Sequence, residues 1–469
     1  MIKSYDAVVI GGGVLGCFAA RNLRRWNIRT LLLEAADDVC TGITRANSAI
    51  IYSGCDHRYG SLKAAMSVRM NAAFEQLSDE LEIPFSRCGS LMTACGPGGE
   101  AILQKKLQQG LKNGVPGMRI ISRNEALEME PMLSGEITAA LYAPTTGTTN
   151  PWQLGIAAYE NALQNGCESL LNTRVRAIRR DGDAYVLETG SEAIHCRAVI
   201  NCAGMQADQV HEMLFEPSVR IRADASDYIM LEKGIPAPKH IIMQETEDRG
   251  KGISAVPTVE GRLMLVSPPR PVNDALYASD AQNLAKLRKS ALRLFPDLKT
   301  EAAVRSFAAI RPNPYRVMMR NGEYVPDGSS IHGFAIENPA PGFYSLIGVK
   351  TPGITCSNEL GLYLAGCTAQ YLNSQVNAGF NPKRIGIASV HRMSFEERAA
   401  LAAQDPAYGD VICLCEDITR GEIMEAIRRG AASVDGIKRR VGATMGRCQG
   451  SRCSRIIEEM LEGYRNGKL

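Results

Sequence analysis

The chain has 469 residues and a formal net charge of +3 at pH 7, and 22% of its residues are charged. This length predicts roughly three domains, and the composition is that of an ordinary globular protein. A net charge this small, without a basic run that carries interleaved aromatic residues, argues against a nucleic-acid partner. No stretch approaches the roughly 18 uncharged apolar residues of a membrane span.

The first twenty residues, MIKSYDAVVIGGGVLGCFAA, have the lysine, apolar run and small residues of a signal peptide. Asp6 and three consecutive glycines interrupt that pattern. We therefore expect a cytoplasmic protein with no integral membrane segment, which would contact a membrane only through a partner.

A strand, a glycine turn, a helix and a second strand open the chain. Ala7–Ile10 is a continuous apolar run, as in a buried parallel strand. Gly11, Gly13 and Gly16 form a G-x-G-x-x-G pattern where this strand meets the helix, which lets the backbone approach a pyrophosphate. The second strand, TLLLE, ends at Glu34, where a ribose hydroxyl would be held. Together these features predict dinucleotide binding better than a glycine turn without a ligand.

FAD fits this motif better than NAD, because the motif begins the chain and TGITRANSAIIYSG follows it. Asn47, Ser48 and the nearby backbone suit a flavin and its phosphates. AVINCAG reads as a later strand with a glycine turn, and GFYSLIGVKTPGIT as a strand, a Pro-Gly turn and a helix start. The residues expected to contact FAD are Gly11, Gly13, Val14, Leu15, Gly16, Glu34, Ala35, Thr44, Asn47, Ser48, Val175, Cys202, Ala203, Gly204, Gly353, Ile354 and Thr355.

The stretches between these segments predict a second domain. FSRCGSLMTAC, DYIMLEK and GRLMLVSPP suggest an antiparallel sheet that forms a substrate domain. RNEALEMEPML reads as a short helix that ends near Pro131. SFEERAALAAQDPAYGD, from Ser394, is polar and alanine-rich, and we interpret it as a linker into a separate C-terminal domain.

The chain has fourteen cysteines, and the last four are clustered. A reducing compartment disfavours structural disulfides, and single cysteines usually behave as small buried hydrophobic residues. Cys413 and Cys415 lie in VICLCED, and Cys448 and Cys453 follow in GRCQGSRC. Four thiolates are what a 2Fe–2S cluster needs. A zinc site, redox-active thiols and inert cysteines are the alternatives, although zinc sites favour two-residue gaps within each pair.

Two short helices are expected around these cysteines. Thr419 can cap the helix RGEIMEAIRRG, with Glu422 completing a capping box and Gly430 closing the helix. SRIIEEMLEGY, after Cys453, reads as the second helix. A cluster that pins two short helices would explain how so small a domain holds together.

The segments NSAIIYSGCDHRYGSLKAAM, PFSRCGSLMTA, SDYIMLEK, SFAAIRPNP and GVKTPGIT resemble the D-amino-acid-oxidase-like FAD oxidoreductases, in the order that family uses. Within the family they are similar to the glycerol-3-phosphate and L-2-hydroxyglutarate dehydrogenases. The last 60 residues resemble the bacterioferritin-associated-ferredoxin-like 2Fe–2S domain. The anaerobic type of glycerol-3-phosphate dehydrogenase large subunit has the same order of parts.

This resemblance implies an α/β fold with three parts. A Rossmann-like FAD-binding domain, residues 1–80, 150–210 and 331–395, is interleaved with an antiparallel-sheet substrate domain, residues 81–149 and 211–330. A linker, residues 396–408, then leads to a small helical iron–sulfur domain, residues 409–469. The resemblance also implies a partner subunit or electron-acceptor protein.

The resemblance places several candidate residues at the flavin, where the protein must bind, orient and deprotonate a small anionic substrate. Arg311 falls at the family's substrate-arginine position, and arginine clamps carboxylates and phosphates well. Tyr52 stands where relatives usually have histidine, and tyrosine, which ordinarily titrates near pH 10, is a poor general base. His57 is a nearby substitute, Lys350 falls where the chain approaches the flavin, and Tyr228 falls where relatives place an aromatic residue over the substrate. Four of these residues also have a plain structural interpretation: Arg311 as a surface ion pair, His57 as a loop histidine, Lys350 as a solvent-facing lysine and Tyr228 as a core tyrosine. Tyr52 could hydrogen-bond the substrate or pack against the isoalloxazine.

Three functions are consistent with these features. The first is an FAD-dependent dehydrogenase that oxidises a small anionic substrate, foremost glycerol 3-phosphate, and passes electrons through the cluster. A 2-hydroxy acid or an amino acid is the alternative substrate. The second is an oxidase that transfers electrons to oxygen, for which the cluster would be unnecessary. The third is a non-catalytic electron-transfer subunit, suggested by the missing histidine but opposed by the intact FAD motif and Arg311.

Overall fold

The first sheet is built around strand β1 (Lys3–Ile10) in the computed structural model, which describes residues 3–190, 192–245, 252–272 and 278–468. β1 lies parallel to β2 (Thr30–Leu33) and to β12 (Ala193–Asn201). The strand order is β10-β11-β12-β1-β2-β9, with β21 parallel to β12 and β20 beside β21. The other strands are β9 (Glu168–Leu170), β10 (Ala177–Asp181), β11 (Ala184–Glu188), β20 (Ala335–Ala340) and β21 (Phe343–Ile347).

Both faces of β1 are buried, as its apolar run predicts. Ala7 and Val9 face a core formed with α1 (Val14–Leu23), α5 (Pro151–Gln164) and α8 (Ser357–Leu372), whereas Val8 and Ile10 face the opposite core. This alternation follows from the two-residue repeat of a strand. Gly361 lets α8 approach α1 closely, because a Cβ there would lie 2.7 Å from the carbonyl oxygen of Phe18. Helices α2 (Leu62–Leu81) and α6 (Ala207–Glu212) complete the two layers.

The second sheet is mainly antiparallel and has the order β19-β18-β13-β16-β15-β14-β5-β7-β6, with β17 beside β13. Its longest strands are β13 (Val219–Leu231) and β18 (Ala303–Arg320), which pair along most of their length. The other strands are β5 (Ser90–Ala94), β6 (Arg119–Ser122), β7 (Ala139–Ala143), β14 (Ile241–Gln244), β15 (Ser254–Pro257), β16 (Leu263–Val266), β17 (Arg270–Pro271) and β19 (Glu323–Pro326).

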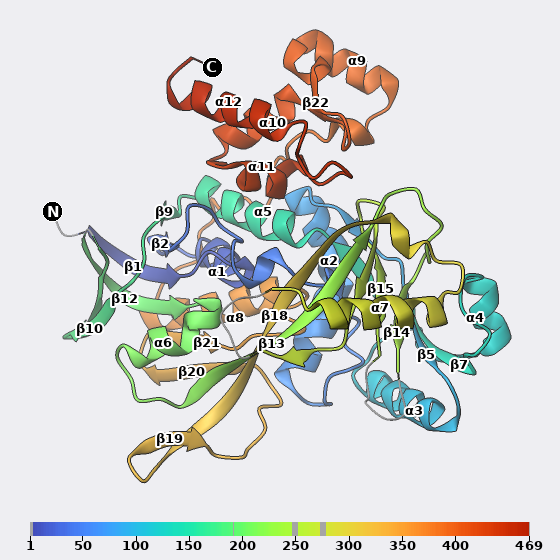
Figure 1. Ribbon diagram of the computed structural model, residues 1–469. Helices are drawn as coiled ribbons and strands as arrows, with labels where there is room; N and C mark the ends of the chain where they lie inside the picture. Colours follow the sequence, from blue (N-terminus) through green and yellow to red (C-terminus); the bar gives the residue numbers. More distant parts are fainter. Residues whose placement is uncertain (1–2, 191, 246–251, 273–277, 469) are drawn as a thin grey trace.

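Helices α3 (Pro97–Lys112), α4 (Arg123–Met129) and α7 (Ala281–Leu294) pack around the second sheet, and the end of β18 projects with β19 as a hairpin (Figure 1). A small third sheet joins β3 (Ile50–Ile51), β8 (Gly147–Thr149) and β4 (Phe85–Ser86). The mixed α/β architecture agrees with the expected fold class.

The C-terminal unit (residues 395–468) contains strands β22 (Val411–Cys413) and β23 (Ile418–Thr419), together with helices α10 (Arg420–Arg428), α11 (Val434–Val441) and α12 (Ser454–Arg465). The expected capping box is present: the Thr419 side chain accepts from the Glu422 backbone, and Glu422 Oε2 accepts from the Thr419 backbone at 2.8 Å. The segment expected as a linker carries helix α9 (Phe395–Gln404), which has its own capping box at Ser394 and Glu397.

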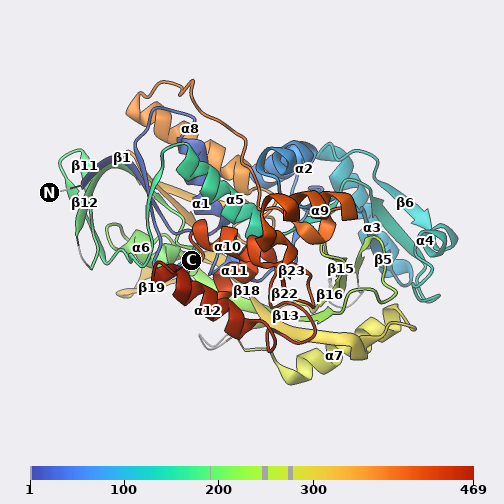
Figure 2. The same ribbon diagram turned by 90° about the horizontal axis from the view of Figure 1, so that it is seen from above.

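The C-terminal unit lies over α5 and over the ends of β13 and β18 (Figures 1 and 2). Helix α11 contacts α5 directly, and Gln153 Nε2 of α5 donates to the Arg440 carbonyl oxygen at 3.0 Å. Across the part of the chain that the structure describes, no helix is both long enough and apolar enough to cross a membrane.

Candidate active site and cysteine cluster

The glycine loop between β1 and α1 has no room for side chains. Gly11 has φ of +100°, and a Cβ there would lie 2.5 Å from the Cys202 carbonyl oxygen. A Cβ on Gly16 would lie 1.8 Å from the Gly11 carbonyl oxygen. Helix α1 has Gly13 at its N-cap and no side-chain cap, so its N-terminal backbone borders open space. This is the cradle that a pyrophosphate needs, with the helix dipole favouring its charge.

Glu34 lies at the end of β2, beside this loop. Its Oε2 accepts from the Gly12 backbone N–H at 2.6 Å, and its Oε1 accepts from the Ala36 N–H at 2.8 Å. Thr44 Oγ1 accepts from the Val14 N–H at 3.0 Å and thereby joins the loop to the segment that follows β2. The carboxylate is therefore held in place next to the cradle.

A cavity of about 540 Å³ runs from the glycine loop to the second sheet, within the usual size range of ligand pockets. It gathers segments from both sheets, as the predicted interleaving of the two domains requires. Of the predicted site residues, those lining it are Gly11, Gly13, Val14, Leu15, Glu34, Ala35, Thr44, Asn47, Ser48, Tyr52, Val175, Cys202, Ala203, Gly204, Tyr228, Arg311, Lys350, Gly353 and Ile354.

Three of the residues predicted at the flavin do not line the cavity. Gly16 lies behind the loop, packed against Gly11. Thr355 is buried, and its Oγ1 accepts from the Tyr52 backbone N–H at 3.0 Å, so it supports the segment that carries Tyr52. His57 lies near the end of α3, where its carbonyl oxygen accepts from Asn113 Nδ2 at 2.7 Å.

The second sheet brings Tyr228 and Arg311 to one end of the cavity. Tyr228 of β13 pairs with Phe307 of β18, and Asp224 pairs with Arg311, so all four residues lie on the same face. The Tyr228 and Phe307 rings are stacked, with centroids 4.7 Å apart. Burial raises the pKa of Tyr228 above its ordinary value, the nearby Tyr52 adds to this, and the charge of Arg311 opposes it. Tyr228 therefore keeps its proton and is a hydrogen-bond donor.

Lys350 reaches the same region from the loop before α8. Its Nζ donates to Asn313 Oδ1 at 2.6 Å, and Asn313 Nδ2 donates to Asp224 Oδ2 at 2.7 Å. This chain of hydrogen bonds fixes Lys350 beside the strand that carries Arg311. Two cations from separate parts of the sequence thus face one cavity.

Several polar lining residues were missed from the sequence. Arg45, Arg174 and Gln206 also line the cavity. Each lies within two residues of a predicted contact, namely Thr44, Val175 or Gly204. Extending each predicted loop by one or two residues would have included them.

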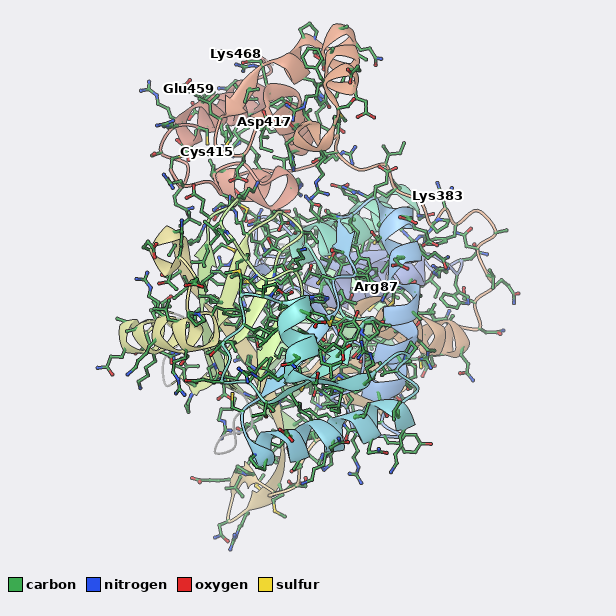
Figure 3. The ribbon with its side chains drawn as sticks, turned by 90° about the vertical axis from the view of Figure 1, so that its right-hand side faces the viewer. Arg87, Lys383, Cys415, Asp417, Glu459 and Lys468 are labelled. Atoms are coloured by element: carbon green, nitrogen blue, oxygen red, sulfur yellow. The ribbon has the colours of Figure 1, made fainter. Side chains whose placement is uncertain are left out.

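The four clustered cysteines form two pairs. The Cys415 and Cys448 sulfurs are 3.5 Å apart, and the thiol of Cys413 lies against that of Cys453. Cys413 and Cys453 belong to the core of the C-terminal unit, whereas Cys415 is exposed and Cys448 half-buried. Figure 3 shows Cys415 near the junction of this unit with the rest of the chain.

Two pairs of thiols match the donor set of a two-iron cluster, in which four cysteines serve two irons. Each pair would supply two of the four thiolates that such a cluster needs.

Buried ion pairs attach the C-terminal unit to the first sheet. Asp38, in the loop after β2, accepts from Arg439 Nη2 at 2.8 Å and from Arg440 Nη1 at 2.7 Å, and all three side chains are buried. Burial alone would raise the pKa of Asp38, but the hydrogen bonds and charges of the two arginines lower it below its ordinary value.

A second set of ion pairs attaches the cysteine loop to the second sheet. Glu416, directly after Cys415, is buried and binds Arg262, and its Oε2 lies 2.7 Å from Lys233 Nζ. Lys233 follows β13, the strand that carries Tyr228 into the cavity. The unit is thus tied to both sheets.

Two family models match the chain in sequence. One, described as FAD dependent oxidoreductase, matches residues 6–366, and one described as BFD-like [2Fe-2S] binding domain matches residues 411–463. A glycerol 3-phosphate dehydrogenase of Caloramator mitchellensis is 35% identical over 462 residues, which cover 97% of this chain and 93% of that relative. The mitochondrial L-2-hydroxyglutarate dehydrogenase of Homo sapiens is 30% identical over 245 residues, 49% of this chain and 52% of that relative.

Solved structures share the fold at lower identity. The L-alpha-glycerophosphate oxidase of Mycoplasma pneumoniae with FAD bound has a TM-score of 0.72 at 21% identity and covers 82% of this chain and 99% of its own. The glycerol-3-phosphate dehydrogenase of Bacillus halodurans complexed with FAD has a TM-score of 0.67 at 14% identity, with 100% of this chain and 92% of its own covered.

Proposed function

Because the chain belongs to the FAD dependent oxidoreductase family, we propose that it is a dehydrogenase that oxidises glycerol 3-phosphate and passes the electrons through its 2Fe–2S cluster to a partner acceptor. Its cofactors are FAD and the 2Fe–2S cluster. When bound, FAD supplies a hydride acceptor and the cluster supplies one-electron transfer. The chain's own residues bind the substrate and hold it in orientation.

The observation that carries this proposal is the pair of cations at one end of the cavity. Arg311 and Lys350 line the same cavity as the glycine loop that fits FAD. A phosphate dianion is bound well by an arginine fork together with a lysine point charge. The cavity therefore selects a small anion and presents it toward the flavin.

Tyr52 and Tyr228 border the cavity near these cations. Because burial keeps Tyr228 protonated, it suits the role of a donor that orients the substrate rather than the role of a base. Tyr52 is held through its backbone by Thr355 and packs against the second-sheet cluster that contains Tyr228. We assign both tyrosines to positioning of the substrate's hydroxyl-bearing carbon.

Glycerol 3-phosphate is favoured over a 2-hydroxy acid by the extent of the similarity. The relative that is a glycerol 3-phosphate dehydrogenase aligns with 97% of this chain, and the alignment therefore reaches into the cysteine segment. The human L-2-hydroxyglutarate dehydrogenase aligns with 49% and that of Arabidopsis thaliana with 77%. L-2-Hydroxyglutarate remains the second candidate, since its carboxylates suit the same cations.

The test is anaerobic mixing of the FAD-loaded protein with one substrate at a time, following loss of the oxidised flavin absorption. We expect bleaching by glycerol 3-phosphate at the lowest concentration, and little or none by L-2-hydroxyglutarate or glycine. Faster bleaching by L-2-hydroxyglutarate would replace the substrate in this proposal. Bleaching by none of the three would favour the non-catalytic electron-transfer subunit.

Dioxygen is the competing acceptor. If the cluster carries the electrons, turnover in air should yield much less than one hydrogen peroxide per substrate oxidised when an artificial one-electron acceptor is present. A yield near one would identify an oxidase instead.

A further inference from the structure

One edge of the cysteine cluster faces solvent. Cys413 and Cys453 are buried among Ile418, Ile457 and other core residues, whereas Cys415 is exposed and Cys448 half-buried. Leu414, between the two cysteines of the first pair, is 70% exposed. An electron would leave a bound cluster most directly across this edge.

The direction in which this edge faces is fixed by packing. Glu416 anchors the cysteine loop to Arg262 and Lys233. A Cβ on Gly446 would lie 2.2 Å from the Cys415 Cβ, so the two cysteine-bearing loops are in close contact. Since the loop cannot turn without breaking a buried ion pair, the same side chains always surround the exposed edge.

The segment that carries Cys448 and Cys453 is positively charged, whereas Glu416 and Asp417 directly follow Cys415. Residues 443–457 include Arg447, Arg452 and Arg455 and no aspartate or glutamate. All three arginines are exposed. Arg447 contacts Glu232, and Arg455 lies 3.0 Å from Glu459. Such exposed pairs are weak and exchange readily with other partners.

We propose that Leu414, Cys415, Arg447, Arg452 and Arg455, which we call the acceptor face, dock an acidic one-electron carrier protein. An exposed leucine beside the cluster supplies a small apolar contact, and the arginines steer an acidic partner toward it. This inference rests on the proposed function in that the cluster is the exit for electrons. Each encounter oxidises the reduced cluster by one electron and reduces the carrier by one, so one substrate, which gives up two electrons, requires two encounters.

The test compares two forms of one carrier. Native cytochrome c is basic, whereas succinylated cytochrome c, whose lysines carry carboxylates, is acidic, and both accept one electron at the haem. The holoenzyme is reduced with dithionite, which is then removed, so the measurement does not depend on the substrate. We expect the acidic form to be reduced at least tenfold faster at low ionic strength, with the advantage falling as salt is added.

Charge reversal locates the face. Arg452→Glu with Arg455→Glu should remove the preference for the acidic form, and Arg455→Glu alone, in the first turn of α12, should reduce it. Arg320→Glu, an exposed arginine on the distant β18–β19 hairpin, is the control and should leave it unchanged (Figure 1). Binding of acidic cytochrome c to the oxidised holoenzyme, measured by calorimetry, should weaken in the same order.

Equal or faster reduction of native cytochrome c would overturn the proposal, as would a preference that survives the double variant with its cluster intact. A further measurement tests binding of the holoenzyme to vesicles of anionic phospholipid. If they bind the holoenzyme through the same arginines while the acidic cytochrome shows no preference, the face contacts a membrane surface and no acidic carrier. If substrate fails to bleach the flavin but the dithionite experiment succeeds, the proposed substrate fails and the acceptor face stands.

Discussion

At the residue scale, Arg311 is the side chain on which recognition of an anion most depends. It lines the cavity from β18, on the same face as Tyr228. Because hydrogen bonds to charged groups are worth about 1.5–3 kcal/mol, Arg311→Ala should lower kcat/KM roughly 10- to 100-fold, mainly by raising KM. Steady-state kinetics with glycerol 3-phosphate measure this. Arg316→Ala, an exposed arginine on the opposite face of the same strand, is the matched control, and equal effects of the two variants would remove Arg311 from the site.

A variant of Tyr228 distinguishes a positioning role from a role as the general base. Burial, with Tyr52 nearby, raises its pKa, so the hydroxyl stays protonated throughout the neutral range. Tyr228→Phe should therefore lower kcat/KM about fivefold by the same factor from about pH 6 to about pH 9, the value of one neutral hydrogen bond. A defect that grows toward alkaline pH would show that Tyr228 ionises during turnover and acts as a base.

At the scale of the element, the turn from β1 to α1 decides whether FAD binds. Gly16→Ala would place a Cβ 1.8 Å from the Gly11 carbonyl oxygen, and the backbone cannot yield there without moving the cradle. We expect a folded protein that retains little FAD, measured as flavin released on denaturation. Gly366→Ala, within α8 and with no atom beyond its own stretch of helix within 4 Å of the added Cβ, is the control and should keep its full FAD content. Normal flavin in Gly16→Ala would show that the cofactor does not use this loop.

Local patterns gave several elements correctly because they depend on neighbours in the chain, although the segment interpreted as a linker carries helix α9. The glycine spacing led to the cradle, and Thr419 with Glu422 led to the capping box of α10. Residues brought together over long distances in the chain could not be found in this way. Asp38 and Arg440 lie 402 residues apart, and no periodicity links them. The pairing of Lys350 with Asn313 likewise depends on how β18 meets the loop before α8.

At the scale of the whole molecule, docking of the C-terminal unit depends on Asp38. Removing its charge leaves Arg439 and Arg440 buried without a counter-ion, which typically costs about 3–5 kcal/mol. Asp38→Asn should therefore lower the unfolding temperature and increase amide exchange in α11. Asp435→Asn removes an exposed carboxylate that pairs with Lys438 on the same helix, and it should change stability by less than about 1 kcal/mol. Equal exchange in the two variants would contradict this account of docking.

The ion pairs of Asp38 with Arg439 and Arg440 also predict that stability depends on pH. Because the folded pKa of Asp38 is lowered, its contribution is fully present above the ordinary value of 3.8 and is lost as pH falls through the lowered value. The stability difference between the natural protein and Asp38→Asn should accordingly be constant at neutral pH and shrink in acid. Calorimetric unfolding at a series of pH values measures this difference. A difference that grows in acid would contradict a lowered pKa of Asp38 in the folded protein.

The central claim is that electrons from glycerol 3-phosphate pass through FAD to the 2Fe–2S cluster of the same chain. The most direct measurement is an anaerobic titration of the holoenzyme with glycerol 3-phosphate, following flavin absorption and the low-temperature EPR signal of the reduced cluster in the same samples, with dithionite giving the full signal. We predict that flavin bleaching is accompanied by an EPR signal that approaches the dithionite value. Bleached flavin with no EPR signal would contradict the claim.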